Sequence, residues 1–173
     1  MNNINKNSKQ NYLISKIKQF FFSNGWEPLP YQVESWKAFL NGENGIIQVP
    51  TGCGKTYAAL MGPLSQIEDP KNNKSVQILL ITPLKALSRD LKNSIQLAAL
   101  HFNKEITVEI RNGDTTPYEK KKQLANPPNI LITTPESLSL LLSNKESNNL
   151  LKELTSIITV SYTHLTLPTT LPV

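Results

Sequence analysis

Short apolar runs and longer segments with spaced apolar positions follow one another along this chain. Continuous runs such as residues 77–81 are typical of strands buried on both faces, as in a parallel sheet covered by helices. Segments with apolar residues three or four positions apart predict the intervening helices. The predicted strands are Gly45–Val49, Val76–Thr82, Ile106–Ile110, Ile130–Thr133 and Ser156–Val160. The predicted helices are 12–23, Tyr31–Leu40, Lys55–Gln66, Lys85–Leu100, Pro117–Leu124, Glu136–Leu142 and Ser147–Leu154.

Strands that alternate with helices predict a doubly wound α/β domain, with a mostly parallel sheet flanked by helices. We expect Gly45–Val49 and Ser156–Val160 to lie next to each other, or nearly so, in this sheet. The 173 residues are about enough for one domain with its own core. Residues 1–11 are rich in Asn, Lys and Ser, so we expect a disordered N-terminus before a domain over residues 12–160.

The chain carries 18 basic and 13 acidic residues, and its net charge of +5 weakly favours an anionic partner such as nucleic acid. Most of the basic residues are lysines and asparagine is abundant, a skew that an AT-rich coding bias would produce without functional selection. The two arginines, Arg89 and Arg111, are more informative because each lies in a motif-like segment. No apolar stretch approaches the roughly 20 residues that span a bilayer, and no secretory signal is apparent. Cys53 is the only cysteine, so no internal disulfide can form, which fits the cytoplasm.

The segment 50–56, Pro-Thr-Gly-Cys-Gly-Lys-Thr, joins a predicted strand to a predicted helix and has the composition of a phosphate-binding loop. Its glycines allow positive φ and a close approach of the backbone to a phosphate. The loop N–H groups and the N-terminus of the following helix together attract a polyphosphate. Lys55 can reach the β and γ phosphates, and Thr56 can bind Mg²⁺. The candidate nucleotide-binding residues of the loop are Thr51, Gly52, Cys53, Gly54, Lys55 and Thr56.

Val49 stands where the strict form of this loop has a glycine, so a chance turn between strand and helix is the alternative. The flanking strand and helix favour the phosphate loop. Gln32 lies about twenty residues before the loop, and its amide offers both a donor and an acceptor, which matches the edge of adenine. The alternative is a polar residue that opens a surface helix. We include Gln32 among the candidate nucleotide-binding residues.

Three further segments place Thr or Gly where a predicted strand ends and a helix begins nearby: 82–91, 111–116 and 130–138. Such junctions expose N–H groups and hydroxyls at one edge of the sheet, where they can hold a nucleic-acid backbone. Helix capping is the alternative for each junction taken singly, but three in this order behind a phosphate loop favour nucleic acid. The candidate nucleic-acid residues are Thr82, Pro83, Lys85, Arg89, Arg111, Gly113, Asp114, Thr115, Thr133, Thr134, Pro135 and Glu136.

Together these motifs are similar to those of the superfamily 2 DEXH-box helicases, in particular the large-helicase-related (Lhr-like) group and its ligase-associated DNA repair branch. The blocks Arg111–Thr115 and Thr133–Ser143 are the most discriminating parts of the resemblance. It implies a RecA-like P-loop NTPase domain that uses ATP and Mg²⁺, with Lys55 and Thr56 as catalytic residues and Gln32 on the adenine. It further implies 3′-to-5′ movement on DNA, with RNA as the other nucleic acid that fits, and partnership with a DNA repair nuclease and a ligase.

In such helicases an acidic Asp-Glu-x-His box follows the strand that corresponds to Ser156–Val160, and it positions Mg²⁺ and the attacking water. Residues 161–173 contain no acidic residue, and we interpret them as a non-native tail in which His164 is uninvolved. A motor with two RecA-like domains needs roughly 300 residues or more, so we expect this chain to be an inactive N-terminal fragment that lacks the second domain. The alternative is a short protein that binds ATP or nucleic acid without hydrolysis. A small P-loop kinase is disfavoured because two arginines cannot supply an arginine-rich lid.

Overall fold

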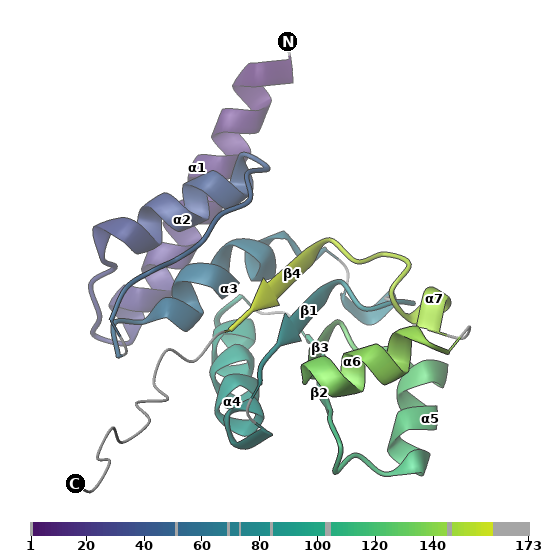
Figure 1. Cartoon of the computed structure of the whole chain (residues 1–173). Coiled ribbons are helices and arrows are strands. Elements are labelled where there is room, and N and C mark those ends of the chain that lie inside the picture. Colours follow the sequence, from purple (N-terminus) through teal and green to yellow (C-terminus); the bar gives the residue numbers. More distant parts are fainter. Residues whose placement is uncertain are drawn as a thin grey trace, which may run out of the picture.

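The computed structural model describes residues 2–50, 52–68, 70–72, 74–83, 85–102, 105–144 and 147–160, with side chains from residue 7 onward. Thr51 and the predicted tail 161–173 lie outside these described residues. After the N-terminal helices, each strand is followed by at least one helix before the next strand, which confirms the predicted α/β fold (Figure 1). The helices are α1 (Asn2–Ser23), α2 (Pro30–Leu40), α3 (Lys55–Gln66), α4 (Lys85–His101), α5 (Pro117–Ala125), α6 (Pro135–Leu142), α7 (Ser147–Leu150) and the short 3₁₀ helix η1 (Pro70–Asn72). The strands are β1 (Ile78–Ile81), β2 (Val108–Arg111), β3 (Ile130–Thr133) and β4 (Ser156–Thr159).

The four strands form one parallel sheet in the order β2-β3-β1-β4. Ile130 pairs with Ile78 on one side and with Val108 on the other, and Ile78 also pairs with Ser156. Because all strands run in the same direction, their carboxyl ends meet at one edge of the sheet. This arrangement confirms the predicted edge, since Thr82, Gly113 and Thr134 each follow one of these ends. Figure 1 shows that α3 begins on the side to which the arrowheads of β1 and β4 point.

The alternation of side chains along the strands divides the core into two clusters. Leu80 and Ile132 are almost completely buried on the face that packs against α3 and α4, and α1 adds Phe20 to the same cluster. Leu79 and Leu131 lie on the opposite face and pack against α6 and α7. Each fully buried aliphatic side chain of this size contributes about 1.5–3 kcal/mol relative to an exposed one. The sheet is therefore a fixed platform between two helical layers.

Helix α1 begins at Asn2 and not at the predicted Tyr12, which corrects the expected start of ordered structure. Gln10 donates from Nε2 to the carbonyl of Leu40 at 2.8 Å and to Asn41 Oδ1 at 3.1 Å. These contacts join α1 to the end of α2. Their partners lie about thirty residues away in sequence, so the local polar composition gave no sign of them.

The stretch Gly45–Val49 is not a strand, so the prediction that it lies beside Ser156–Val160 in the sheet is wrong. Among the described residues β4 pairs with β1 alone, and Ile46 is 95% exposed. A strand exists only where a neighbour satisfies its hydrogen bonds and covers its side chains. Gly45 has no side chain to pack, and Pro50 at the other end has no N–H to donate. The apolar run therefore has strand propensity without a strand partner.

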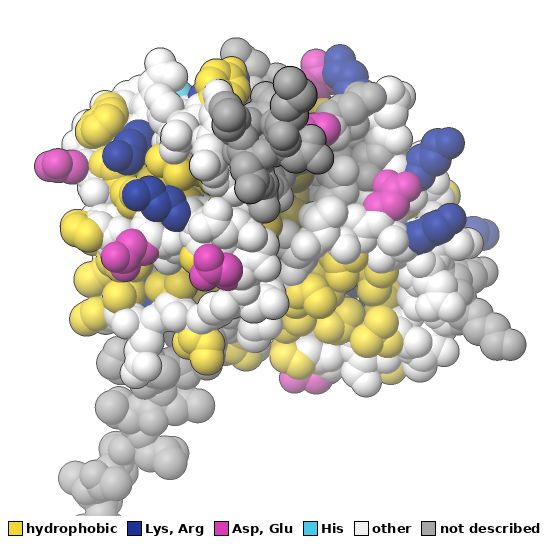
Figure 2. Space-filling model, turned by 90° about the horizontal axis from the view of Figure 1, so that it is seen from above, with side chains coloured by type: hydrophobic (Ala, Val, Ile, Leu, Met, Phe, Trp, Pro, Cys, Tyr) yellow, Lys and Arg dark blue, Asp and Glu magenta, His cyan; other side chains and the backbone are white. Residues whose placement is uncertain are grey.

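Basic and acidic side chains are interspersed on the face seen in Figure 2, and no single basic patch is visible there. Hydrophobic side chains do gather on this face, and exposed apolar residues of the chain include Leu140, Leu142 and Ile157. No helix among the described residues is both long and apolar enough to cross a membrane. The net charge alone therefore does not locate an anion site. A candidate site has to be identified from the local geometry of the sheet edge.

Candidate nucleotide and nucleic-acid site

The phosphate loop leads into α3 and contains two residues with left-handed backbone conformation. Gly52 has φ +79°, and Gly54, the N-cap residue of α3, has φ +82°. A Cβ at Gly54 would also lie 2.7 Å from Gln32 Nε2, so no other residue fits there without displacing that amide. The loop thus has the positive φ values that the sequence predicts, and the N-terminus of α3 lies directly behind its N–H groups.

Lys55 is the first residue of α3, and its side chain turns back onto the loop. Its Nζ donates to the carbonyl of Val49 at 2.6 Å and to the carbonyl of Pro50 at 2.9 Å. The ammonium therefore lies where an anion bound to the loop N–H groups would meet it. A phosphate oxygen carries a full negative charge, so it attracts the ammonium more strongly than a neutral carbonyl oxygen does. A polyphosphate can therefore replace both carbonyls as the partner of Lys55.

Helix α2 is fastened to the loop by two adjacent side chains. Gln32 is buried; its Nε2 donates to the carbonyl of Gly54 at 3.1 Å, and its Oε1 accepts the N–H of Leu29 at 2.9 Å. The hydroxyl of Tyr31 donates to the carbonyl of Cys53. Burial raises the pKa of Tyr31, and the nearby Cys53 raises it further, so the hydroxyl keeps its proton at neutral pH. The conformation of the loop is thereby linked to the position of α2.

Tyr31 was not indicated by any sequence motif. Its role depends on a loop carbonyl 22 residues away in sequence, which only the folded chain brings within reach. Its place next to Gln32, in the first turn of α2, is the one local signal that could have identified it.

Of the predicted threonines, Thr82, Thr133 and Thr134 are buried and Thr115 is half-buried. Thr133 Oγ1 donates to the carbonyl of Arg111 at 2.8 Å, and Thr134 caps α6 by accepting the N–H of Ser137. Thr82 is also fully buried, and its hydroxyl has no hydrogen-bond partner among the described residues. The predicted nucleic-acid residues that face solvent are Pro83, Lys85, Arg89, Gly113, Asp114, Pro135 and Glu136.

Arg111 points into the protein and not toward solvent, with 8% of its surface exposed. Its Nη1 donates to the carbonyl of Lys120 and to Gln123 Oε1, both at 3.2 Å. Gln123 in turn donates from Nε2 to the carbonyl of Ile110 at 3.0 Å. Burial lowers the pKa of Arg111, because the charged form loses water contacts. Arg111 therefore fastens α5 to β2 from within, together with Gln123, which no sequence motif indicates.

The turn between β2 and α5 is held by its own side chains. Thr115 Oγ1 accepts the N–H of Asn112 at 2.9 Å, and Asn112 Oδ1 accepts the N–H of Asp114 at 2.9 Å. Thr116 and Glu119 form a capping box at the start of α5. Hydrogen bonds from the side chain and backbone of Thr116 lower the pKa of Glu119. The turn therefore presents the carboxylate of Asp114 from a fixed backbone.

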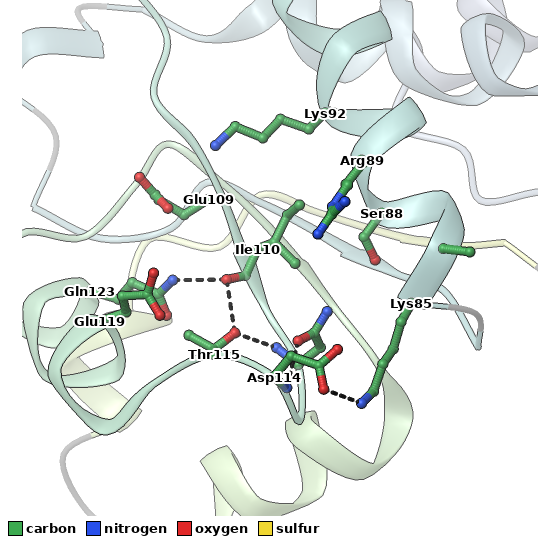
Figure 3. Close-up of a pocket in the computed structure, with 12 residues that line it drawn as sticks. Lys85, Ser88, Arg89, Lys92, Glu109, Ile110, Asp114, Thr115, Glu119 and Gln123 are labelled. Carbon is green, nitrogen blue, oxygen red and sulfur yellow. Dashed lines mark hydrogen bonds and ion pairs between the residues drawn. The ribbon is translucent and has the colours of Figure 1, made fainter.

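A groove of about 570 Å³ lies between α4 and this turn (Figure 3). The charged residues that line it are Lys85, Arg89 and Lys92 from α4, Glu109 from β2, Asp114 from the turn and Glu119 from α5, so positive and negative charges are balanced. Lys85 Nζ and Asp114 Oδ1 form an ion pair across it at 2.6 Å. The groove brings together residues from two predicted segments and adds Lys92 and Glu119, which the sequence did not indicate.

The predicted site residues lie in three separate regions of the protein and do not form one pocket. These are the phosphate loop with α2, the groove beside α4, and the start of α6 with Pro135 and Glu136. Neither the phosphate loop nor the start of α6 lines the groove among the residues that the structure describes. The groove and the start of α6 both lie at the carboxyl edge of the sheet, where ligands bind in open α/β sheets.

Comparison with known proteins shows that this chain is similar to helicases. The model of the DEAD/DEAH box helicase family matches residues 29–159. The Lhr helicase/probable uracil glycosylase of Mycolicibacterium smegmatis is 34% identical over 153 residues, which cover 82% of this chain and 10% of that protein. The Lhr helicase/uracil glycosylase of Escherichia coli is 35% identical over 142 residues, which cover 72% of this chain and 9% of that protein.

Solved structures that resemble this chain are also helicases. The structure of Mycobacterium smegmatis helicase Lhr bound to ssDNA and AMP-PNP superimposes with a TM-score of 0.71 at 33% sequence identity, over 83% of this chain and 19% of that one. The DUF1998 helicase MrfA bound to DNA gives a TM-score of 0.69 at 25% identity, over 82% of this chain and 20% of that one. This chain therefore has a RecA-like helicase fold and spans about a tenth of the curated relatives named above.

Proposed function

Because the chain belongs to the DEAD/DEAH box helicase family, we propose that it is the ATP-binding N-terminal part of an ATP-dependent helicase that moves 3′ to 5′ on DNA and acts in DNA repair. The phosphate loop carries this proposal: two glycines at positive φ precede a lysine that is folded over loop carbonyls. The ssDNA and AMP-PNP bound to the Mycobacterium smegmatis relative support it. RNA would fit the same exposed residues, so the choice of DNA rests on the resemblance to Lhr-like helicases.

In the proposed complex the loop N–H groups bind the β and γ phosphates of ATP. Lys55 leaves the carbonyls of Val49 and Pro50 and donates to phosphate oxygens, where its charge opposes the charge of the nucleotide. Thr56, in the first turn of α3, directs its hydroxyl to Mg²⁺. Bound Mg²⁺ supplies neutralisation of the charge on the phosphates. Thr51, which lies outside the described residues, stays a predicted loop contact.

We assign adenine recognition to Gln32. Both ends of its amide already have protein partners, Gly54 through Nε2 and Leu29 through Oε1. Binding of adenine therefore requires Gln32 to exchange or share one of these hydrogen bonds, each with a net contribution of about 0.5–1.5 kcal/mol. Since Gly54 belongs to the phosphate loop, this exchange would link recognition of the base to the conformation of the loop.

We place the nucleic-acid strand along the carboxyl edge of the sheet. Lys85 and Arg89 are exposed there and supply positive charge, and the start of α6 offers the N–H of Glu136, since Pro135 has none and Thr134 accepts that of Ser137. The buried threonines and Arg111 support this surface from below. Partnership with a DNA repair nuclease and a ligase, and a cytoplasmic location, are proposed from the sequence resemblance and composition alone.

Hydrolysis needs an acidic group that positions the attacking water. Residues 154–173 contain no acidic residue, so we propose that this chain binds ATP without turning it over. The same observation favours the alternative, a protein that binds ATP or nucleic acid and does not hydrolyse. Both proposals make the phosphate loop the nucleotide site.

The test is a titration of the complete chain with fluorescent ADP, compared among wild type, Lys55→Ala and Lys37→Ala. Lys37 is an exposed lysine in the last turn of α2 and provides the control for loss of one positive charge. We expect Lys55→Ala to weaken binding at least about tenfold, equivalent to about 1.4 kcal/mol, and Lys37→Ala to bind like wild type. Equal binding by all three proteins would overturn the site. ATP hydrolysis by this chain would overturn the proposed lack of turnover.

A further inference from the structure

We propose that Tyr31 is a positioning residue for phosphate binding: its hydroxyl holds the peptide bond between Cys53 and Gly54 so that the N–H of Gly54 faces the nucleotide phosphates. The inference rests on the proposed function, because it assigns a further role at the same nucleotide site. It concerns the phosphates and not the base, which is assigned to Gln32. Tyr31 acts through a carbonyl of the loop and not through direct contact with the ligand.

The hydrogen bond of Tyr31 sets the orientation of one peptide bond in the loop. In a planar trans peptide the C=O and the N–H point in opposite directions. The hydroxyl of Tyr31 donates to the carbonyl of Cys53, so the N–H of Gly54 points away from α2. Gly54 has left-handed backbone conformation and Lys55 begins the helix, a turn in which successive N–H groups form a concave anion site. Tyr31 therefore orients the peptide bond that supplies the first of these N–H groups.

The carbonyl of Cys53 has fewer partners than the carbonyl that follows it. The carbonyl of Gly54 accepts from Gln32 Nε2 at 3.1 Å and from the N–H of Ala58 at 3.2 Å. Within the described part of the chain, the carbonyl of Cys53 accepts from Tyr31 alone. If Gln32 turns to adenine, Ala58 still holds the carbonyl of Gly54. Loss of the Tyr31 hydroxyl leaves no such second donor for Cys53.

The peptide bond between Cys53 and Gly54 is one that can rotate readily. Its rotation changes ψ of Cys53 and φ of Gly54, and a glycine adopts φ of either sign at little cost. Gly54 has φ +82°, and a change to negative φ would turn its N–H away from a bound phosphate. A Cβ at Gly54 would lie 2.7 Å from Gln32 Nε2 and 4.0 Å from the Tyr31 hydroxyl, so α2 fills this side of the glycine. The hydrogen bond from Tyr31 opposes the rotation that glycine itself permits.

Tyr31 extends from a helix that is fixed before any nucleotide binds. Helix α2 packs against α3 (Figure 1). Trp36 of α2 is fully buried, and its Nε1 donates to the carbonyl of Tyr57 in the first turn of α3 at 3.0 Å. The position of the Tyr31 hydroxyl is therefore set by packing. A loop held in its binding conformation avoids the cost of ordering when the phosphates bind.

The experiment titrates the complete chain with inorganic tripolyphosphate and with fluorescent ADP, for wild type and Tyr31→Phe. Tripolyphosphate carries no base, so its binding reports on the loop alone. We expect Tyr31→Phe to weaken the binding of both ligands by the same factor, about two- to tenfold, the range that corresponds to one neutral hydrogen bond. Weakened binding of ADP with unchanged binding of tripolyphosphate would place Tyr31 at the base and overturn the proposal.

Amide NMR of the isotope-labelled chain gives a readout that a mere loss of stability would not change. In wild type, saturation with tripolyphosphate should shift the N–H resonances of Gly54 and Lys55, because both groups face the anion. In saturated Tyr31→Phe the shift of Gly54 should be smaller. The shift of Lys55 should be unchanged, since Gln32 and Ala58 hold its peptide bond. Equal shifts of Gly54 in the two proteins would overturn the role of Tyr31.

The matched control is Ser35→Ala, which removes a hydroxyl from the same helix. Ser35 Oγ donates to the carbonyl of Tyr31 at 2.8 Å, so this hydrogen bond stays within α2. We expect Ser35→Ala to bind both ligands like wild type. Equal weakening by Ser35→Ala and Tyr31→Phe would mean that any change in α2 acts on the loop, and it would overturn the role of the Tyr31 hydroxyl.

The wild-type titrations separate failure of this role from failure of the proposed function. A wild-type chain that binds neither ADP nor tripolyphosphate would overturn the ATP site and the role of Tyr31 with it. A wild-type chain that binds both ligands, with Tyr31→Phe binding them equally well, would overturn the role of Tyr31 and leave the ATP site standing.

Discussion

Replacement of Gln123 by alanine tests whether α5 and its turn are held from within by Arg111. Gln123 is 4% exposed and forms two hydrogen bonds that join α5 to β2: it accepts from Arg111 Nη1 at 3.2 Å and donates to the carbonyl of Ile110 at 3.0 Å. In Gln123→Ala the buried guanidinium keeps the carbonyl of Lys120 as a partner and loses the side-chain amide. The carbonyl of Ile110 keeps only the longer contact with the Thr115 hydroxyl at 3.3 Å.

A hydrogen bond to a charged group contributes about 1.5–3 kcal/mol, and a neutral one about 0.5–1.5 kcal/mol. Because each group keeps one partner, we expect a loss of about 2 kcal/mol in the free energy of unfolding. For a chain of this size that loss lowers the midpoint of thermal unfolding by about 4–8 °C. Gln123→Glu retains an acceptor for Arg111 and loses the donor to Ile110, so its loss should be smaller.

The assay is thermal and urea unfolding followed by circular dichroism, with Gln96→Ala as the control. Gln96 is an exposed glutamine on α4, so its replacement should change the free energy of unfolding by no more than about 0.5 kcal/mol. Unfolding of Gln123→Ala at the same midpoint as Gln96→Ala would refute the reasoning, because Arg111 would then be equally stable without its amide partner.

Two further predictions concern the links on either side of the sheet edge. Tyr31→Phe removes the hydroxyl that donates to the carbonyl of Cys53. We expect urea unfolding to show a loss of about 0.5–1.5 kcal/mol in the free energy of unfolding and titration with ADP to show a higher Kd. The control Tyr118→Phe, at a site that is 77% exposed, should change neither quantity. The pKa of Glu119 in the folded state is lower than its ordinary pKa of 4.5. The ionised cap therefore stabilises the fold at pH values above 4.5, and this stabilisation is lost as the pH falls through the lower pKa of the folded state. Wild type should therefore be more stable than Glu119→Gln at neutral pH, and the difference should shrink in acid; an advantage that grew as pH fell would contradict this.

Local sequence patterns were sufficient for the features that depend on neighbouring residues. The parallel sheet follows from short apolar runs such as 78–81 and 130–133, because strands buried on both faces need no polar positions. The cap at Thr134 and the left-handed Gly54 follow from the same kind of information, since each depends on the chemistry of one or two adjacent positions.

Features that depend on distant partners could not be predicted in this way. Arg111 was expected at a nucleic-acid surface, but its partner Gln123 lies twelve residues away on another element and draws it into the protein. Gly45–Val49 has the propensity of a strand but no strand beside it, so the residue preference alone was misleading. Tyr31 contacts a loop, and Lys92 lines a groove, that exist only in the folded chain.

The most direct test of the ATP site is a crystal structure of the complete chain with AMP-PNP and Mg²⁺. We predict that Lys55 Nζ leaves the carbonyls of Val49 and Pro50 and lies about 2.7–2.9 Å from phosphate oxygens of the nucleotide. The loop N–H groups should surround the β phosphate, with Gly52 and Gly54 still at positive φ. A structure in which Lys55 remains on both carbonyls while the nucleotide binds elsewhere would contradict the account.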